Sequence, residues 1–406
     1  MPTLTDIREA SERVRDRVIR TPLVYSPTFS GMTGAEVYLK LECMQKGGSF
    51  KVRGATNRVL ARRDEIGQKG VIAASAGNHA QGVALAARLA GVPVTIVMPE
   101  WVSISKEEAT RGYGASVVLA GTTLAGSITI AEEMASREGM TFIHPYDDDA
   151  VIAGQGTIGI EILEDLPEVD LVVVPVGGGG LIAGIALAVK GIRQEARVIG
   201  VQAEACPSAL EALMAGQPVL VPDKYTIADG IRVRQAGELT FPVIRDYVDE
   251  VVTVPEEAVL DAMLELLERK KVVAEGAGAV GLAALVTGSV PVNPGERVVV
   301  VISGGNVDTA LLERVIRRGR FRSGRILQFT ILLEDVSGTL SGLLAVLACE
   351  KANILHVVQA RSEPVYPIQF TRVEVEVETR GPAHIERIRT ALEEAGYRIR
   401  IAEYAG

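Results

Sequence analysis

Short runs of apolar, often β-branched residues alternate with helix-like stretches over most of this chain, between about residues 35 and 316. The runs are EVYLKLE, GVIAAS, VTIVMP, SVVLAG, LVVVPV, RVIGVQAE and RVVVVIS, and clear helical stretches are NHAQGVALAARLAG and LIAGIALAVKGI. Apolar strands that alternate with helices are typical of a parallel sheet covered on both faces. The alternation therefore predicts an α/β fold that binds ligands at the carboxyl ends of its strands.

The pattern changes near residue 317. A short basic segment, RRGRFRSGR (residues 317–325), is interpreted as a linker or an exposed helix end. After it come strand ILQFTILLE, helix GTLSGLLAVLACEKA, strand ILHVVQAR, strand IQFTRVEVEVE, helix AHIERIRTALEEAG and strand YRIRIAE. This βαββαβ order is ferredoxin-like. We therefore expect a large body (residues 1–316, with a smaller lobe at about 52–150), a linker (317–325) and a small domain (326–406).

Composition narrows the class of protein. The chain has 406 residues, of which 48% are hydrophobic and 23% charged, as in an ordinary globular protein. Its net charge of −9 argues against nucleic acid as a partner. The three cysteines, Cys43, Cys206 and Cys349, show no paired spacing, which argues against both a disulfide framework and a zinc site.

Two segments bear on membranes and export. The first twenty residues mix acidic and basic side chains and lack the apolar core of a secretory signal. The run LVVVPVGGGGLIAGIALAV (residues 171–189) is long and uncharged enough to resemble a membrane span. Pro175 and four glycines interrupt it, so a buried strand, a glycine loop and a buried helix explain it better. We expect a cytoplasmic protein with no membrane partner.

Glycine-rich segments carry the clearest chemical signals. The loop PVGGGGLIAG (residues 175–184) follows an apolar strand and opens a helix, where free backbone N–H groups bind phosphate. The loop lacks the GxGxxG of a dinucleotide site, and the chain contains no Walker GxxxxGK[ST] motif. The loop therefore indicates a phosphate-bearing cofactor of another kind.

A second loop, SAGNHAQG (residues 75–82), lies at another junction from strand to helix. Its amides, with Ser75, Asn78 and His79, could bind a substrate carboxylate, and Asn78 could donate to a phenolic oxygen. Ser75 and Asn78 could equally cap the helix. For His79, a buried structural histidine is favoured over a catalytic base, because no partner acid is in view.

Three further segments each offer a single polar group. Ser303 in VVISGGNVD could meet a ring nitrogen or cap the next helix, and Glu275 in AEGAGA could contact a cofactor or act as a cap. Lys51 in GGSFKVRGA follows a glycine turn that allows a bulky ligand to approach. An amine, a phosphate loop and a partner for a pyridine nitrogen together suit pyridoxal 5'-phosphate.

The segments GGSFKVRGA, SAGNHAQG, GGGGL, TIADGI and SGGNVD, in that order, resemble the threonine dehydratases (threonine ammonia-lyases) of the fold-type II pyridoxal-phosphate enzymes, the tryptophan synthase β superfamily. The resemblance covers nearly the whole chain, and the tail looks like an ACT domain, a regulatory module that binds small metabolites. It implies two α/β lobes with mostly parallel sheets, followed by a ferredoxin-like domain.

Site residues follow from this resemblance, motif by motif. Lys51, preceded by Ser49 and Phe50, corresponds to the Schiff-base lysine, and Ser303 to the partner of the pyridine nitrogen. The remaining cofactor contacts that it implies are Phe50, Asn78, Gly177, Gly178, Gly179, Gly180 and Leu181. Glu275 is added to this set because of its position in AEGAGA. The substrate carboxylate would be lined by Ser75, Ala76, Gly77, Asn78 and His79.

The activity that the resemblance implies is deamination of L-threonine to 2-oxobutanoate and ammonia, with L-serine to pyruvate as a side activity. Lys51, once freed by the substrate, would act as the general base at Cα. A neutral serine at the ring nitrogen does not stabilise a pyridinium cation, which favours β-elimination over transamination.

Other functions remain open. Serine racemases share the fold and the lysine, but their loop has a second serine as an acid-base where this chain has Ala76. Their metal pattern places an acidic residue six positions after a glutamate, and here Leu210 stands six after Glu204, so we predict no metal. Threonine synthase would need a second phosphate site. A non-catalytic amino-acid sensor is disfavoured by the intact Lys51.

The tail carries its own predictions. By resemblance to ACT domains, an effector site would include Asp335, Gly338, Leu340, Asn353 and Ile354, in segments that usually meet at an interface between two such domains. Gly338 and Asn353 could instead only shape a turn and a helix end. Candidate effectors are isoleucine, valine or a nucleotide, and roles in isoleucine biosynthesis and in threonine breakdown both stay open. We expect a homo-oligomer, a tetramer by resemblance.

Overall fold

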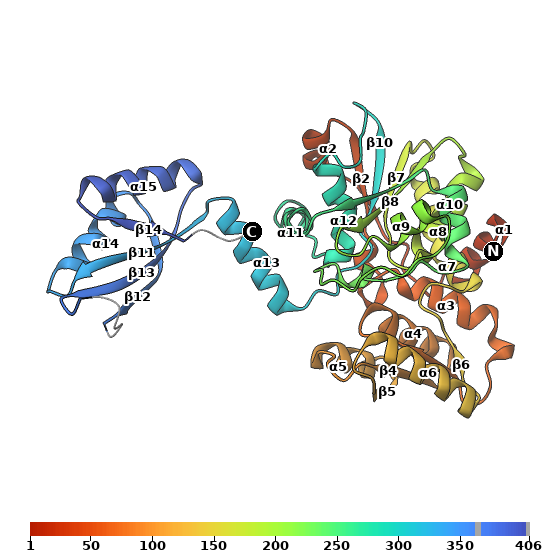
Figure 1. Cartoon of the computed structure of the whole chain (residues 1–406). Helices are drawn as coiled ribbons and strands as arrows, with labels where there is room; N and C mark the ends of the chain where they lie inside the picture. Colours follow the sequence, from red (N-terminus) through yellow and green to blue (C-terminus); the bar gives the residue numbers. More distant parts are fainter. Residues whose placement is uncertain (362–366, 403–406) are drawn as a thin grey trace. The chain divides into compact units, whose positions relative to one another are not determined.

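The computed structural model describes residues 1–361 and 367–402. It divides into two compact units, Met1–Asp308 and Thr309–Gly406, which are treated separately below (Figure 1).

The first unit contains two sheets. The larger has the order β1-β2-β10-β7-β8-β9, and all its neighbours are parallel except the pair β1 and β2. Its strands are β1 (Leu23–Tyr25), β2 (Glu36–Lys40), β7 (Leu171–Pro175), β8 (Arg197–Ala203), β9 (Glu250–Val254) and β10 (Arg297–Val301). The inner strands β7 and β8 are buried along almost their whole length, which is why they read as continuous apolar runs.

The smaller lobe has a fully parallel sheet in the order β5-β4-β3-β6. Its strands are β3 (Val71–Ala74), β4 (Val94–Met98), β5 (Ser116–Leu119) and β6 (Thr141–Phe142). The chain enters this lobe after β2 and returns to the larger sheet at β7, so the smaller lobe is an insertion in the larger one (Figure 1).

Helices and short turns complete the first unit. The helices are α1 (Leu4–Val14), α2 (Pro27–Thr33), α3 (Lys51–Ala61), α4 (Asn78–Ala90), α5 (Ile104–Gly112), α6 (Leu124–Glu138), α7 (Asp149–Asp165), α8 (Gly180–Ile192), α9 (Ser208–Ala215), α10 (Thr240–Tyr247), α11 (Glu256–Glu265) and α12 (Gly276–Val286). Short helical turns are η1 (Glu42–Met44), η2 (Lys46–Gly48), η3 (Arg63–Glu65), η4 (Asp229–Ile231) and η5 (Leu266–Lys270). Helices α4 and α8 begin just after the carboxyl ends of β3 and β7, where the N-termini of helices in such folds meet ligands.

The second unit is an antiparallel sheet in the order β12-β13-β11-β14, with helices α14 and α15 on one face. Its elements are α13 (Thr309–Arg322), β11 (Ile326–Glu334), α14 (Thr339–Cys349), β12 (Asn353–Ala360), β13 (Phe370–Glu378), α15 (Pro382–Glu394) and β14 (Ile399–Ile401). On β11, Phe329, Ile331 and Leu333 are buried in the core with the helices, whereas Thr330 and Leu332 face away from it.

The predicted fold class is confirmed. Each apolar run named above forms a strand, and β11 has the predicted bounds, residues 326–334. The run at residues 171–189 forms β7, a glycine loop and α8, and no helix among the described residues is long and apolar enough to cross a membrane. Residues 317–322 of the predicted linker are helical, because α13 continues through Arg322. The predicted last strand extended to residue 403, which lies outside the described residues.

Candidate active site

Lys51 is the first residue of α3, directly after a turn with two glycines in the left-handed region. Gly47 and Gly48 both have φ of +73°, and a Cβ on Gly48 would overlap the side chain of Asn306. Position 48 therefore requires glycine, because another residue would be strained at this φ and its Cβ would collide with Asn306. It directs Lys51 so that Nζ donates a 2.8 Å hydrogen bond to the carbonyl oxygen of Pro145.

The Lys51 amine is prepared to act as a nucleophile or base. Burial lowers the pKa of Lys51 to about 8, against a smaller opposite effect of the Glu275 carboxylate. A buried ammonium is disfavoured because it loses its hydration. The ring of Phe50 lies with its centroid 5.1 Å from Nζ and is half-buried.

The glycine loop joins β7 to α8. Gly179 has φ of +98°, and a Cβ on Gly178 would lie 2.5 Å from the ring of Tyr146. The hydroxyl of Thr240 donates to the Gly178 carbonyl oxygen at 2.6 Å, which holds the loop from outside. Residues 177–180 carry no side chains of their own, so the backbone N–H groups at the start of α8 are suited to bind an anion.

Asn78, at the start of α4, lies in a hydrogen-bond chain that joins three segments distant in sequence. Its Nδ2 donates to Glu275 Oε1 at 2.6 Å, and its Oδ1 accepts from Asn306 Nδ2 at 2.7 Å. Burial, the largest cause, and the Asp229 carboxylate together raise the pKa of Glu275 to about 7, against the opposite effect of the Asn78 hydrogen bond. Since the Glu275 charge also acts on the pKa of Lys51, this chain belongs to the surroundings of the amine.

Ser303 follows the end of β10 and is buried. Its hydroxyl makes one hydrogen bond within the described residues, a long one of 3.5 Å to the carbonyl oxygen of Ala277. The backbone carbonyl of Ser303 accepts from the N–H of Phe50 at 3.1 Å, and Ser49 forms an isolated bridge with Gly304. These contacts fix the strand end that carries Ser303 against the turn that carries Lys51.

The loop at residues 75–79 is shaped by its own side chains. Ser75 Oγ accepts from the Gly77 N–H at 3.1 Å, and Ser75, Ala76 and Gly77 are all half-buried. His79 Nε2 lies 2.9 Å from the Ile143 carbonyl oxygen, and burial together with the Lys51 charge lowers the pKa of His79 to about 3. The imidazole is neutral and donates to that carbonyl, which agrees with the structural interpretation of His79.

Contacts between the predicted segments bring much of the predicted site together. The Lys51 turn meets the Ser303 segment, and Asn78 meets Glu275, while Leu181 is buried in the first turn of α8. Three residues of the site were not predicted from the sequence. Pro145 contacts Lys51, Tyr146 lies against Gly178, and Asn306 contacts Asn78. The segment HPYDDD (residues 144–149) could have indicated the first two, because a proline and polar residues follow the end of a strand there.

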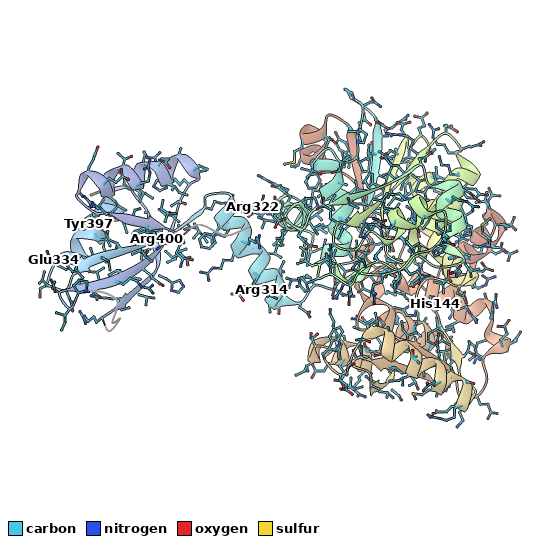
Figure 2. The ribbon with its side chains drawn as sticks, in the orientation of Figure 1. His144, Arg314, Arg322, Glu334, Tyr397 and Arg400 are labelled. Atoms are coloured by element: carbon cyan, nitrogen blue, oxygen red, sulfur yellow. The ribbon has the colours of Figure 1, made fainter. Side chains whose placement is uncertain are left out.

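Asp147 anchors the segment that carries Tyr146. Its carboxylate accepts from the backbone N–H groups of Glu238, Leu239 and Thr240, at the start of α10. His144, labelled in Figure 2, accepts through Nδ1 from the Asp147 N–H at 2.7 Å, and its ring meets that of Tyr146 edge to face. The segment 144–147 therefore connects Lys51, the glycine loop and α10.

A buried ionic cluster lies on the same helix as Lys51, two residues further along. Arg53, fully buried, donates to Glu42 Oε2 at 2.8 Å and to Glu161 Oε1 at 2.6 Å. Lys40 Nζ contacts Glu161 Oε2 at 2.6 Å, and the Thr21 hydroxyl donates to Glu42. The cluster ties α3 to α7 and to the end of β2. It was not predicted, because its partners are up to 121 residues apart.

Comparison with known proteins identifies the family. A model described as "Pyridoxal-phosphate dependent enzyme" matches residues 14–304. The L-threonine ammonia-lyase of Thermotoga maritima is 49% identical to this chain over 99% of it and 100% of the relative. The chain belongs to the pyridoxal-phosphate-dependent enzymes.

Two solved structures illustrate the range of similar proteins. A threonine deaminase from T.th. aligns with a TM-score of 0.71 and 42% identity, over 76% of this chain and 99% of the other. Maize serine racemase aligns with a TM-score of 0.74 and 37% identity, over 79% of this chain and 98% of the other. The fold of the first unit is therefore shared by enzymes with different names.

The residues of this chain fit pyridoxal phosphate. The glycine loop before α8, where a Cβ on Gly178 would overlap the ring of Tyr146, suits the phosphate, and the amine of Lys51 has a lowered pKa. Ser303 has a hydroxyl with little competing hydrogen bonding, and Asn78 Nδ2 is a donor held in place by Glu275. Each of the functional groups that the cofactor requires is thus present in the first unit.

The predicted effector residues lie in the second unit and form two groups. Asp335 accepts from Arg361 Nε at 3.1 Å at one end of the sheet, near Gly338 and Leu340 at the start of α14. Asn353 and Ile354 begin β12 and pair with the far end of β13, at Glu378 and Val377. Within one chain, the group around Asp335 and the group around Asn353 therefore lie at opposite ends of the sheet.

Proposed function

We propose that this chain deaminates L-threonine to 2-oxobutanoate and ammonia, with L-serine to pyruvate as a side reaction. The observation that carries the proposal is the Lys51 amine, with its pKa lowered to about 8, in a site that has a neutral serine, Ser303. The 49% identity to an L-threonine ammonia-lyase over nearly the whole chain supports the choice of reaction.

In the proposed reaction, each residue has a defined task. Lys51 removes the proton from Cα of the substrate and passes it from Nζ to the β-hydroxyl, which leaves as water; a water molecule then releases the amino nitrogen as ammonia. The N–H groups of the loop at residues 75–79 orient the carboxylate, and the glycine loop holds the phosphate. When bound, pyridoxal phosphate supplies an electron-withdrawing ring that stabilises the negative charge left at Cα. Ser303 accepts or donates a hydrogen bond at the ring nitrogen without adding charge there.

Ala76 favours elimination over racemisation. Racemisation needs an acid on the face opposite Lys51 to return a proton to Cα, and a methyl side chain has none to give. The alignment with maize serine racemase makes serine racemisation the second candidate. The two candidates differ in product, since elimination gives a 2-oxo acid and racemisation gives the D-amino acid.

The test is an assay of the purified holoprotein with L-threonine and with L-serine, following 2-oxo acids and the D-isomers in the same samples. We expect 2-oxobutanoate from threonine, and its loss in Lys51→Ala. D-serine as the main product from L-serine, with no 2-oxobutanoate from threonine, would support the second candidate instead.

We further propose that the second unit regulates the first as an ACT domain in a homo-oligomer. Asn353, a predicted effector residue, donates to Glu378 Oε2 at 3.4 Å, and Glu378 Oε1 accepts from Arg320 of α13 at 2.6 Å. Because α13 is the helix that follows Asp308, this chain of contacts links an effector residue to the segment that leads to the catalytic unit.

A complete effector site would need two copies of the domain. Asn353 and Asp335 lie at opposite ends of β13, whose nine residues separate them by roughly 27 Å. β12 is an edge strand, and antiparallel pairing with a second β12 would bring the Asn353 end of one copy to the Ala360 end of the other. Arg361, next to that end, already contacts Asp335.

Deletion of residues 326–406 tests the regulatory proposal. We expect the truncated chain to keep deaminase activity and to lose any response to isoleucine, valine or AMP, each added in turn. A response that survives the deletion would place the effector site in the first unit, contrary to the proposal.

A further inference from the structure

A hollow of about 470 Å³ lies on the second unit, and none of its lining residues is a predicted effector residue. It is formed over β11 and β14, at the edge of the sheet opposite β12. Its lining residues are Thr330, Ile331, Leu332, Arg372, Gly396, Tyr397, Arg398, Ile399 and Arg400. We call it the arginine groove.

The arginines of this groove converge from two strands onto the face of the sheet that the helices leave open. Thr330 and Leu332 point to that face, since Phe329, Ile331 and Leu333 are buried on the other. Arg372 of β13 is directly opposite Leu332, and Arg400 is directly opposite Thr330, so both share the open face. Arg398 shares it too, because it is two residues from Arg400.

The charges in the groove are not balanced by its own residues. Arg372 Nη2 is paired with Glu374 Oε1 at 2.5 Å. Among residues 1–361 and 367–402, however, no carboxylate lies within ion-pair distance of Arg398 or Arg400. Figure 2 shows Arg400 on β14, near Tyr397 of the same segment. Arg398 and Arg400 stand two residues apart on one face of the sheet, where like charges repel one another unless an anion lies between them.

The groove also offers an apolar surface. Leu332, at its floor, is 44% exposed, although the other leucines of β11, Leu327 and Leu333, are buried. Charged side chains on an edge strand often serve only to prevent pairing with another sheet. That role does not require a hollow, a third arginine from a strand away from the edge, or an exposed leucine among them.

We propose that the arginine groove binds a small organic anion, whose carboxylate or phosphate is held by Arg398 and Arg400 and whose apolar part covers Leu332. Guanidinium groups bind both kinds of anion through paired N–H donors. This site goes beyond the proposed function: it is separate from the cofactor site, and the anion would be held by Arg400 of β14 and Arg398 just before it, not by β12 or the β11–α14 turn.

Protection from an arginine reagent tests the proposal on the full-length holoprotein. The protein is treated with phenylglyoxal in sodium chloride, acetate or inorganic phosphate of equal ionic strength, and modification of each arginine is followed by peptide mass spectrometry. Protection should equal 1 + [L]/Kd, which is about threefold at twice the Kd, at Arg398 and Arg400. Arg389, which pairs with Glu386 and Glu393, serves as the control.

Each outcome bears on the proposal. Slower modification of Arg398 and Arg400 in phosphate or acetate than in chloride, with Arg389 unchanged, supports it, and the more effective anion identifies the group bound. Equal rates in all three salts would overturn it. This measurement needs no variant, so a folding defect cannot obscure it.

A matched variant gives the second measurement. In Arg398→Gln/Arg400→Gln, calorimetric binding of the more protective anion should fall at least about tenfold, as expected when two charge-assisted contacts are lost. Arg389→Gln should bind as the native chain does, and unchanged affinity in the double variant would contradict the proposal. Deaminase activity is recorded in parallel, and its failure in every chain would count against the proposed function without affecting the protection result.

Discussion

The ion pairs that hold α3 in the first unit and α13 in the second differ in their exposure to solvent. In the first unit, Arg53 is fully buried between Glu42 and Glu161, on the helix that begins with Lys51. In the second, Arg317 and Arg320 of α13 pair with Glu376 and Glu378, with arginine side chains 50% and 30% exposed. Buried pairs tolerate no loss of a partner, whereas exposed pairs contribute little to stability.

This difference indicates where each unit is rigid. The helix that begins with Lys51 is held by buried ionic groups, so its position is fixed by the fold itself. On α13, the Arg320–Glu378 pair is partly exposed on both sides and can exchange with solvent at small cost, whereas Glu376, the partner of Arg317, is itself buried. Contacts that the proposed regulation changes between two states should be of the first kind. The predictions below test this contrast, from the largest expected effect to the smallest.

Arg53→Met should cause the largest loss of stability. It leaves Glu42 and Glu161 with less positive charge in a buried cluster, and breaking such a cluster costs about 3–5 kcal/mol in free energy of unfolding. The measurement is denaturant unfolding of the holoprotein. The control is Arg20→Met, which breaks an exposed pairing with Glu164 and Asp165 and should cost at most about 1 kcal/mol. If both variants lose the same free energy of unfolding, buried and exposed ion pairs do not differ in their contribution to stability.

Lys51 should capture pyridoxal phosphate with a pH midpoint near its lowered pKa of about 8, not near the ordinary 10.5. Only the unprotonated amine reacts, so the rate of capture by the apoprotein should rise with pH and level off above the midpoint. Stopped-flow absorbance of the bound cofactor measures this rate. In Glu275→Gln the midpoint should fall, because the carboxylate charge raises the pKa of Lys51. A midpoint near 10.5 would show that burial does not act on this amine.

Gly178→Ala should weaken cofactor binding without unfolding the chain. The added Cβ would lie 2.5 Å from the Tyr146 ring, and such overpacking costs about 1–3 kcal/mol. Equilibrium dialysis of pyridoxal phosphate measures the loss. Gly31→Ala, where no atom lies within 4 Å of the added Cβ, is the control. Adding Tyr146→Ala to Gly178→Ala should restore cofactor binding. If it does not, the collision with Tyr146 is not the cause of the weaker binding.

How far the sequence predicts this molecule depends on whether a feature is local. The bounds of β11 and the Lys51 turn follow from periodicity and from glycines beside a lysine, which are properties of neighbouring residues. The contacts of Tyr146 with Gly178, and of Asn306 with Asn78, join segments far apart in the chain. No pattern within either segment encodes them.

The segment at residues 317–325 shows the same limit. Its arginines and glycines are typical of a linker, yet α13 continues through Arg322 with Gly319 buried. Its partners, Glu376 and Glu378, lie almost sixty residues further along, on β13. Arginine is itself a good helix former, so the composition of the segment allows a helix as well as a linker, and its tertiary contacts with β13 are not encoded in the segment itself.

Arg320→Ala should have the smallest effect on stability and the most selective effect on regulation. Its exposed pair with Glu378 contributes about 0–1 kcal/mol, so free energy of unfolding and basal deaminase rate should stay close to those of the native chain. The response to an effector should nevertheless change, because Glu378 also accepts from Asn353 and would lose its contact with α13.

The matched control for Arg320 is Arg314→Ala on the same helix, labelled in Figure 2, whose Nε donates to the Ala310 carbonyl oxygen of its own helix. A double-mutant cycle with Asn353→Ala measures whether Arg320 and Asn353 act together on the effector concentration for half-maximal response. Non-additive changes would show that α13 transmits the effector signal. Additive changes, or equal effects of Arg314→Ala and Arg320→Ala, would mean that the exposed pairs of the second unit only secure a helix, and that regulation takes another route.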